Sequence, residues 1–188
     1  MVAIMTLWLP ILLATVLVFV ASAIIHMFLP YHRNDFLAVP NEDGVMEALR
    51  RFDLPAGDYS TPSAGGDPAV LKSEAFREKA RKGPVVFMTV LPKGDPFAMG
   101  AQLTQWFVYC LVISVMAAYV AGRAVAPGAP YLEVFRFAGV AAFLGYAGGL
   151  AQRSIWYKLS WSTTFKSTFD AFVFALLTAG AFGWLWPA

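Results

Sequence analysis

Charged residues are scarce in this sequence, and they are unevenly distributed. Asp, Glu, Lys and Arg make up 14% of the 188 residues, whereas the apolar types AVILMFWYC make up 59%. Soluble domains contain about a quarter charged residues. Of the 26 charged side chains (14 basic and 12 acidic), nineteen fall between Arg33 and Asp95, and the long stretches on either side hold almost none. This pattern excludes an ordinary soluble domain and predicts membrane-spanning segments around one polar loop.

Several chemical signatures are also missing. The single cysteine, Cys110, cannot form an intrachain disulfide. The sequence has no dinucleotide-binding GxGxxG, no Walker A loop, no GxSxG, no HExxH and no CxxC. A net charge of only +2 gives no broad basic field for nucleic acid. We therefore predict no cofactor, no nucleic-acid partner and no catalytic residues, and we do not expect an enzyme.

Four segments are long and apolar enough to cross a bilayer, which requires about 20 mainly apolar residues in a helix. They cover residues 4–29, 102–125, 131–153 and 167–186. We predict an all-α integral membrane protein in which residues 1–29 hold the first transmembrane helix, residues 30–101 form a loop with two short helices, and residues 102–188 complete the membrane bundle.

The first apolar segment could instead be a secretory signal peptide, because Ala21-Ser22-Ala23 has the A-x-A form of a cleavage site. No Lys or Arg precedes the apolar run, and the run is longer than the apolar core of a signal peptide. We therefore predict a retained helix.

Lys and Arg near the ends of the spans set the predicted orientation. Six of them flank the side that holds the long loop: Arg33, Lys82, Lys93, Arg153, Lys158 and Lys166. Only Arg123 and Arg136 flank the other side. This excess predicts a multi-pass protein of the cell (inner) membrane with both termini outside and the large loop in the cytoplasm.

The long loop contains its own local signals. Asn41 precedes two acidic residues and then apolar residues at helical spacing, which predicts a helix ending near Arg51. A second helix is predicted over residues 73–82, where Gly83-Pro84 ends it. Residues 54–68 are expected to be irregular, and residues 84–91 to form a strand or lie along the membrane surface. The loop has too little apolar content for a large core, so it should pack against the membrane domain or a partner.

Small residues recur four positions apart in three of the spans, as close helix packing in lipid favours. They are Ser114, Ala118 and Gly122; Ala138, Ala142, Gly145 and Gly149; and Ala171, Ala175, Ala179 and Gly183. We interpret these faces as packing within a four-helix bundle, with a dedicated dimer face as the alternative.

Asp170 is the most unusual side chain, because an ionisable group inside a span costs roughly 2.5–3.5 kcal/mol at the bilayer centre. Lys166 lies four positions earlier, and Arg153 ends the preceding span. The simplest interpretation is an ion pair at the membrane interface that holds the hairpin between the last two spans.

A functional interpretation is also possible, because all four spans carry a polar residue near the cytoplasmic end and these residues lie at a similar depth in the membrane. The predicted polar cluster consists of Asp170, Arg153, Lys166, Gln105, Gln152 and His26. We hypothesise that it lines a cavity for a proton, an ion or a small anion, although polar residues are also ordinary at this depth. His26 and His32 lie on either side of Pro30 with no obvious third ligand, so we predict no metal or haem site.

These observations favour a non-enzymatic accessory, assembly or interaction subunit of a membrane complex. Its expected partners are the lipid bilayer and other membrane-protein subunits, or a second copy of the chain. The alternative is a small oligomeric transporter or channel for an ion or solute that uses the polar cluster. An enzyme acting on a lipid or quinone would need a catalytic constellation that the sequence does not show.

Overall fold

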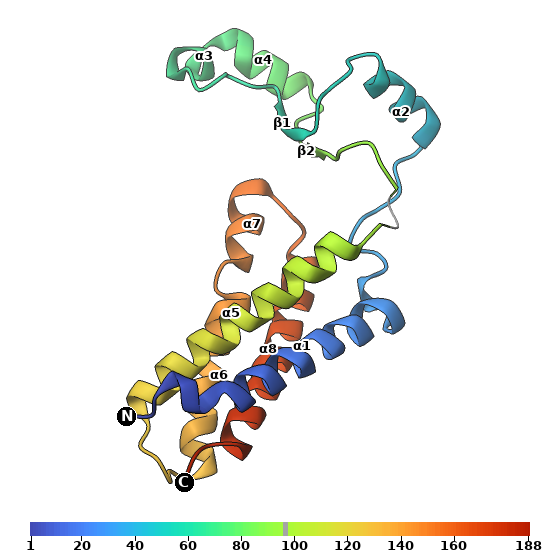
Figure 1. Ribbon diagram of the computed structural model, residues 1–188. Helices are drawn as coiled ribbons and strands as arrows, with labels where there is room; N and C mark the ends of the chain where they lie inside the picture. The colour runs from blue at the N-terminus through green and yellow to red at the C-terminus, as the bar shows by residue number, and fades with distance from the viewer. Residues whose placement is uncertain (96–97) are drawn as a thin grey trace. The chain divides into compact units, whose positions relative to one another are not determined.

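The computed structural model describes residues 1–95 and 98–188, and the chain divides into two compact units. The helical unit comprises residues 1–37 and 98–188, and the loop unit comprises residues 38–97. The structure is mostly helical, and each unit is described by itself (Figure 1).

The helical unit contains four helical stretches that are long and apolar enough to cross a membrane, which confirms that prediction. Its elements are η1 (Ile4–Leu7), α1 (Trp8–Phe28), η2 (Pro30–His32), α5 (Gly100–Ala124), α6 (Tyr131–Ala147), α7 (Leu150–Tyr157) and α8 (Trp161–Trp184). The first stretch combines η1 with α1, and the third combines α6 with α7. These stretches give the helical unit the architecture expected of a four-span membrane protein.

Two boundaries differ from the prediction. The third stretch is interrupted at Gly148 and Gly149, because each glycine disfavours the helix interior by about 1 kcal/mol relative to alanine. The fourth helix begins at Trp161 and not at residue 167, so most of the predicted 154–166 loop is helical. Apolar content alone missed this start because the first turns carry Ser, Thr and Lys. Lys158 adopts a left-handed conformation (φ 59°) that ends α7.

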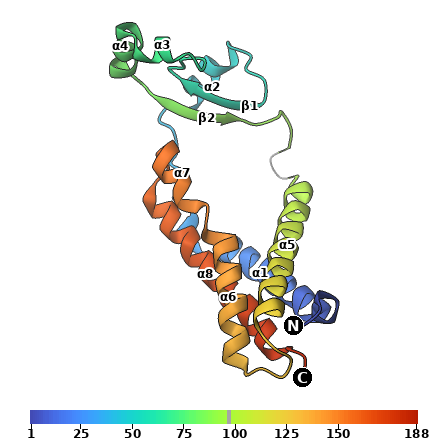
Figure 2. The same ribbon diagram turned by 90° about the vertical axis from the view of Figure 1, so that its left-hand side faces the viewer.

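The four long helices pack around each other, with α1 and α6 each contacting both α5 and α8. α6 and α8 lie side by side in both views (Figure 2). The two chain ends lie together beside the α5–α6 turn, where the Val2 amide donates to the Gly122 carbonyl at 2.8 Å and the Gly128 amide donates to the Pro187 carbonyl at 2.9 Å. An even number of helices brings the termini to this shared end.

Small residues form much of the interface between these helices. Ten of the buried positions are Ser114, Ala117, Ala118, Ala121, Gly122, Ala138, Ala142, Ala171, Ala175 and Ala179. At Gly145, a Cβ atom would come within 2.6 Å of Ile113 Cδ1, so its hydrogen side chain permits the close approach. Gly149 faces open space, and the GxxxG pattern therefore contributes only its first glycine to packing. The predicted small-residue faces largely point into the bundle.

The described part of the loop unit, residues 38–95, contains three helices and a two-stranded sheet. Its elements are α2 (Glu42–Arg50), β1 (Gly57–Thr61), α3 (Pro68–Lys72), α4 (Glu74–Lys82) and β2 (Val86–Val90). β1 and β2 are antiparallel, with Gly57 opposite Val90 and Thr61 opposite Val86. The segment expected to be irregular therefore supplies a strand, and residues 86–90 pair with it. The Ser73 hydroxyl caps α4 by accepting from the Phe76 amide at 3.2 Å, whereas Asn41 makes no side-chain cap on α2.

Candidate functional site

The candidate site lies where the chain leaves α1 and turns back against α8. α1 ends at Phe28, Leu29 is extended, and Pro30 begins the short helix η2. Proline lacks an amide hydrogen and suits the first position of a new helix better than the continuation of an old one. The turn brings η2 into contact with α8 and directs Tyr31, His32 and Asp35 toward the fourth span.

Asp170 on α8 receives two of these groups. Asp170 is only 3% exposed, so both of its carboxylate oxygens need hydrogen-bond partners inside the protein. The Tyr31 hydroxyl donates to Oδ1, and His32 Nε2 bonds to Oδ2 at 2.8 Å. Burial and the hydrogen bond to Asp170 raise the pKa of the Tyr31 hydroxyl above its ordinary value.

Asp35 extends this network to the start of α8. His32 Nδ1 lies 2.6 Å from Asp35 Oδ2, and Lys166 Nζ donates to Asp35 Oδ1 at 2.7 Å. Partial burial opposes ionisation of Asp35, but the bonds from His32 and Lys166 outweigh it and hold the pKa of this carboxyl below its ordinary value. His32 thus lies between two carboxylates, one from its own segment and one from the fourth span.

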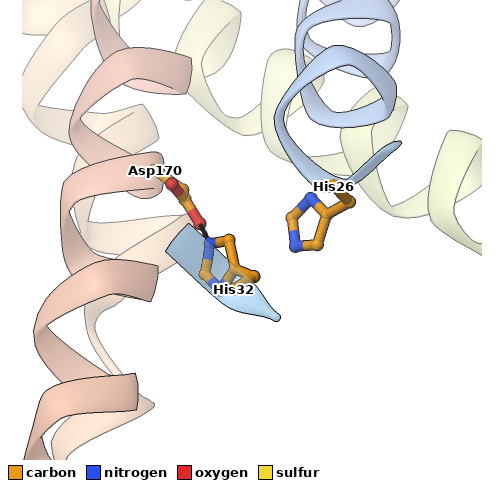
Figure 3. Close-up of side chains that lie close together, drawn as sticks. All are labelled: His26, His32 and Asp170. Carbon is orange, nitrogen blue, oxygen red and sulfur yellow. Dashed lines mark hydrogen bonds and ion pairs between the residues drawn. The ribbon is translucent and has the colours of Figure 1, made fainter. Parts of the chain in front are cut away.

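His26 completes the group from the last turn of α1. Its ring stacks on that of His32, with centroids 4.8 Å apart and an interplanar angle of 9° (Figure 3). His26 Nδ1 lies 2.9 Å from the Ser22 carbonyl oxygen, and the Ser22 hydroxyl accepts from Trp106 Nε1 at 2.7 Å. We call the set Tyr31, His26, His32, Asp35, Lys166 and Asp170 the rim cluster.

The structure brings together three of the six residues predicted for a polar cluster: Asp170, Lys166 and His26. The expected pairing within them differs, because Lys166 bonds to Asp35 and not to Asp170. Asp170 also lies nine positions after the start of α8, and not one turn inside it, because the helix begins earlier than predicted.

The other three predicted residues stand apart from the rim cluster. Gln105, Gln152 and Arg153 are exposed. Within the described parts of the chain, their side chains form none of the hydrogen bonds or ion pairs that build the rim cluster. A shared depth along the helices was therefore not enough to place them in one site, because side chains at one level can point to different faces.

Three members of the cluster were missed by sequence reasoning: Tyr31, His32 and Asp35. A partial signal exists, since His32 and Asp35 have the i, i+3 spacing of a helical ion pair immediately after an apolar run. Their contact with α8 joins positions more than 130 residues apart, which a single sequence does not reveal.

The rim cluster is a polar network built around the buried Asp170, and its chemistry limits what it can do. Removing Asp170 would leave Tyr31 and His32 without their partner in a medium of low dielectric constant. Such networks add little net stability compared with apolar residues, but they can specify a single arrangement of the groups they join. Carboxylates and imidazoles are also the side chains that hold protons and divalent metal cations.

A second feature is the apolar face of α2 in the loop unit. Val45, Met46, Leu49 and Phe52 follow helical spacing and are all exposed, Phe52 by 71%. No described residue of the loop unit is buried. Apolar groups gathered on one exposed face mark a surface for association.

Comparison of the chain with protein-family models, with curated proteins and with solved structures finds no match.

Proposed function

We propose that this chain is a non-enzymatic accessory or assembly subunit of a membrane complex and that it acts through association by its loop unit. The observation that carries the proposal is the exposed apolar face of α2 in a unit whose described residues, 38–95, include none that is buried. A 60-residue segment of this kind gains little stability from its own packing. A partner that covers Met46, Leu49 and Phe52 would bury apolar surface that the segment leaves exposed by itself.

The charges on α2 favour a protein as the occupant of this face. Helices that lie on membrane surfaces are rich in Lys and Arg on their polar side. α2 instead begins with Glu42 and Asp43 and carries Glu47 on the side opposite Leu49, where it pairs with Arg50. The expected partner is therefore another membrane-protein subunit. The apolar face of α2 would lie in an apolar groove on that subunit, as amphipathic helices do when they bind in a groove.

The rim cluster supports this function by holding the chain where it leaves the first span. Tyr31, His32 and Asp35 attach the segment after α1 to α8, so the residues that lead toward the loop unit start from a fixed point. A buried network suits this role because it selects one arrangement of α1, η2 and α8.

The proposed test places a photoreactive benzoylphenylalanine at position 49 or, as a matched control, at position 47 on the polar side of α2. In native membranes, position 49 should form an adduct with one identified membrane protein, and position 47 should not. The same protein should co-elute with the unmodified chain in mild detergent and be lost from the double variant Met46→Gln, Leu49→Gln.

Three outcomes of this experiment would contradict the proposal. Adducts with lipid alone would make α2 a membrane-surface helix. An adduct of twice the mass of the chain would replace the partner subunit with a second copy. A strictly monomeric particle without a co-eluting protein would remove association altogether.

We propose that the protein lies in the inner membrane, with both termini outside and the loop unit in the cytoplasm. This orientation is supported by the excess of Lys and Arg on the loop side. Native Cys110 is fully buried, so single cysteines introduced elsewhere can be labelled selectively. An impermeant maleimide should label Ala126→Cys in intact cells and Ser63→Cys only after permeabilisation; the reverse pattern would overturn the orientation.

A small oligomeric transporter or channel is the second candidate function. It is favoured by one observation, the convergence of His26 and Asp170 in a single cluster. It is opposed by the packing of the helical unit, where fully buried alanines such as Ala14, Ala117 and Ala138 bring the helices close together. A pathway would therefore have to lie between copies of the chain.

A further inference from the structure

We propose that His26, His32 and Asp170 bind one divalent transition-metal cation at the rim of the helical unit. One ring nitrogen from each histidine and one carboxylate oxygen of Asp170 all lie within 4.8 Å of one another. The three ligands come from α1, η2 and α8, and Figure 3 shows the ring of His26 directed toward the other two side chains. Two imidazoles and one carboxylate therefore lie near one another, and because the two rings are stacked, the His26 ring has to turn for its nitrogen to face the same cation as His32 and Asp170.

The groups behind the two histidines orient them as metal ligands. His26 Nδ1 faces the Ser22 carbonyl oxygen at 2.9 Å, and His32 Nδ1 faces Asp35 Oδ2 at 2.6 Å. Metal-bound histidines use one ring nitrogen for the cation and donate the other N–H to a carbonyl or carboxylate, which fixes the tautomer. In both histidines the acceptor on Nδ1 leaves Nε2 for the cation. Asp35 is in turn held by Lys166 at 2.7 Å.

The carboxylate of Asp170 is also oriented by a neighbouring side chain. Tyr31 donates to Oδ1, which leaves Oδ2 as the oxygen that faces His32 Nε2 at 2.8 Å. A cation bound between these two atoms takes the place of the hydrogen that they share, and His32 releases that proton. The other hydrogen bonds of Asp170 and His32 can stay in place while the cation is bound.

The donor set selects the class of cation. Imidazole nitrogen suits zinc, iron, copper and nickel, whereas magnesium and calcium prefer oxygen ligands only. Ligand bonds of about 2.0–2.2 Å to zinc put neighbouring donors of a tetrahedral site about 3.3 Å apart. His32 Nε2 and Asp170 Oδ2, now 2.8 Å apart, would separate slightly to admit the cation, and the exposed His26 side chain would turn toward them. Three protein ligands leave a fourth position for water or another ligand.

The charge of the cluster also favours a cation. Two carboxylates, Asp35 and Asp170, face one lysine, so the cluster without its histidines carries a formal charge of −1. A bound cation would connect the end of the first span to the fourth span through metal bonds. The site thus goes beyond the association role of the loop unit, because it resides entirely in the helical unit.

The test uses the full chain, purified in mild detergent through a tag without histidine and stripped with a chelator. Equilibrium dialysis should show about one Zn²⁺ bound per chain, with Mg²⁺ failing to compete. His26→Gln and His32→Gln should each weaken zinc binding by at least about 100-fold. Asp35→Asn changes the residue that bonds to His32 Nδ1 and is not itself a proposed ligand. This variant should weaken zinc binding by about 10- to 100-fold. Asp43→Asn in α2 is the matched control and should leave binding unchanged.

His26→Gln is the decisive variant because His26 is exposed and its ring is held by the Ser22 carbonyl and by stacking on His32, so its replacement should leave the fold intact. Unchanged zinc affinity in this variant, or no stoichiometric zinc in the unaltered chain, would overturn the proposal. A second measurement avoids variants: Co²⁺ bound to the unaltered chain should show the visible absorption of a four- or five-coordinate nitrogen and oxygen site. A spectrum identical to that of aqueous Co²⁺ would also overturn it.

Discussion

Replacement of Asp170 with alanine is expected to lower the free energy of unfolding by about 3–5 kcal/mol, the cost of breaking a buried ion pair by removing one partner. The substitution removes the acceptor for both the Tyr31 hydroxyl and His32 Nε2. Both groups are partly buried, so each would lose a hydrogen-bond partner inside the protein. The loss should appear in reversible unfolding of the chain in mixed micelles with increasing SDS.

Glu133→Ala is the matched control for this variant. Glu133 is an exposed acidic residue in the first turn of α6, where a favourable interaction with the helix dipole contributes about 0.3–1 kcal/mol. A loss below about 1 kcal/mol for Asp170→Ala, equal to that of the control, would contradict the rim cluster as a buried network.

Ala138→Leu is expected to destabilise the helical unit by about 1–3 kcal/mol, as overpacking of a well-packed core does. Ala138 is fully buried on α6 and belongs to the same apolar core as Ala117, Ala181 and Phe182. In lipid, helices associate by close contact between small side chains, so a leucine here must separate the helices or adopt a strained rotamer. The same unfolding measurement would report the loss.

Val140→Leu serves as the matched control two positions away. Val140 is 61% exposed on the outer surface of α6, where lipid can accommodate a larger apolar side chain. The control should change the free energy of unfolding by less than about 0.5 kcal/mol. Equal effects of the two substitutions would show that α6 does not pack through Ala138.

The sequence predicted the four long helices because lipid imposes a simple requirement. A span needs a continuous apolar stretch of sufficient length, and this property is visible in a single sequence. Helix boundaries were less predictable where polar and apolar signals disagreed. The Gly148-Gly149 interruption follows from the low helix propensity of glycine, whereas the polar first turns of α8 could not be recognised from apolar content.

The rim cluster could be predicted only in part. Asp170, Lys166 and His26 were recognisable because polar groups within apolar helices are costly. Tyr31, His32 and Asp35 were not, because the turn at Pro30 decides where the following residues point. The prediction of no metal site rested on the lack of an obvious third ligand beside His26 and His32; the turn stacks these two rings and brings Asp170 next to His32.

The segment after the first span is bonded to the fourth span through His32 and Asp170. A double-mutant cycle measures that bond directly: His32→Ala, Asp170→Ala and the double variant are unfolded under the same conditions, with a chelator present throughout. We expect a coupling free energy of about 1–3 kcal/mol between the two positions. Effects that add to within about 0.5 kcal/mol would contradict this bond, because they would show that the two side chains do not interact.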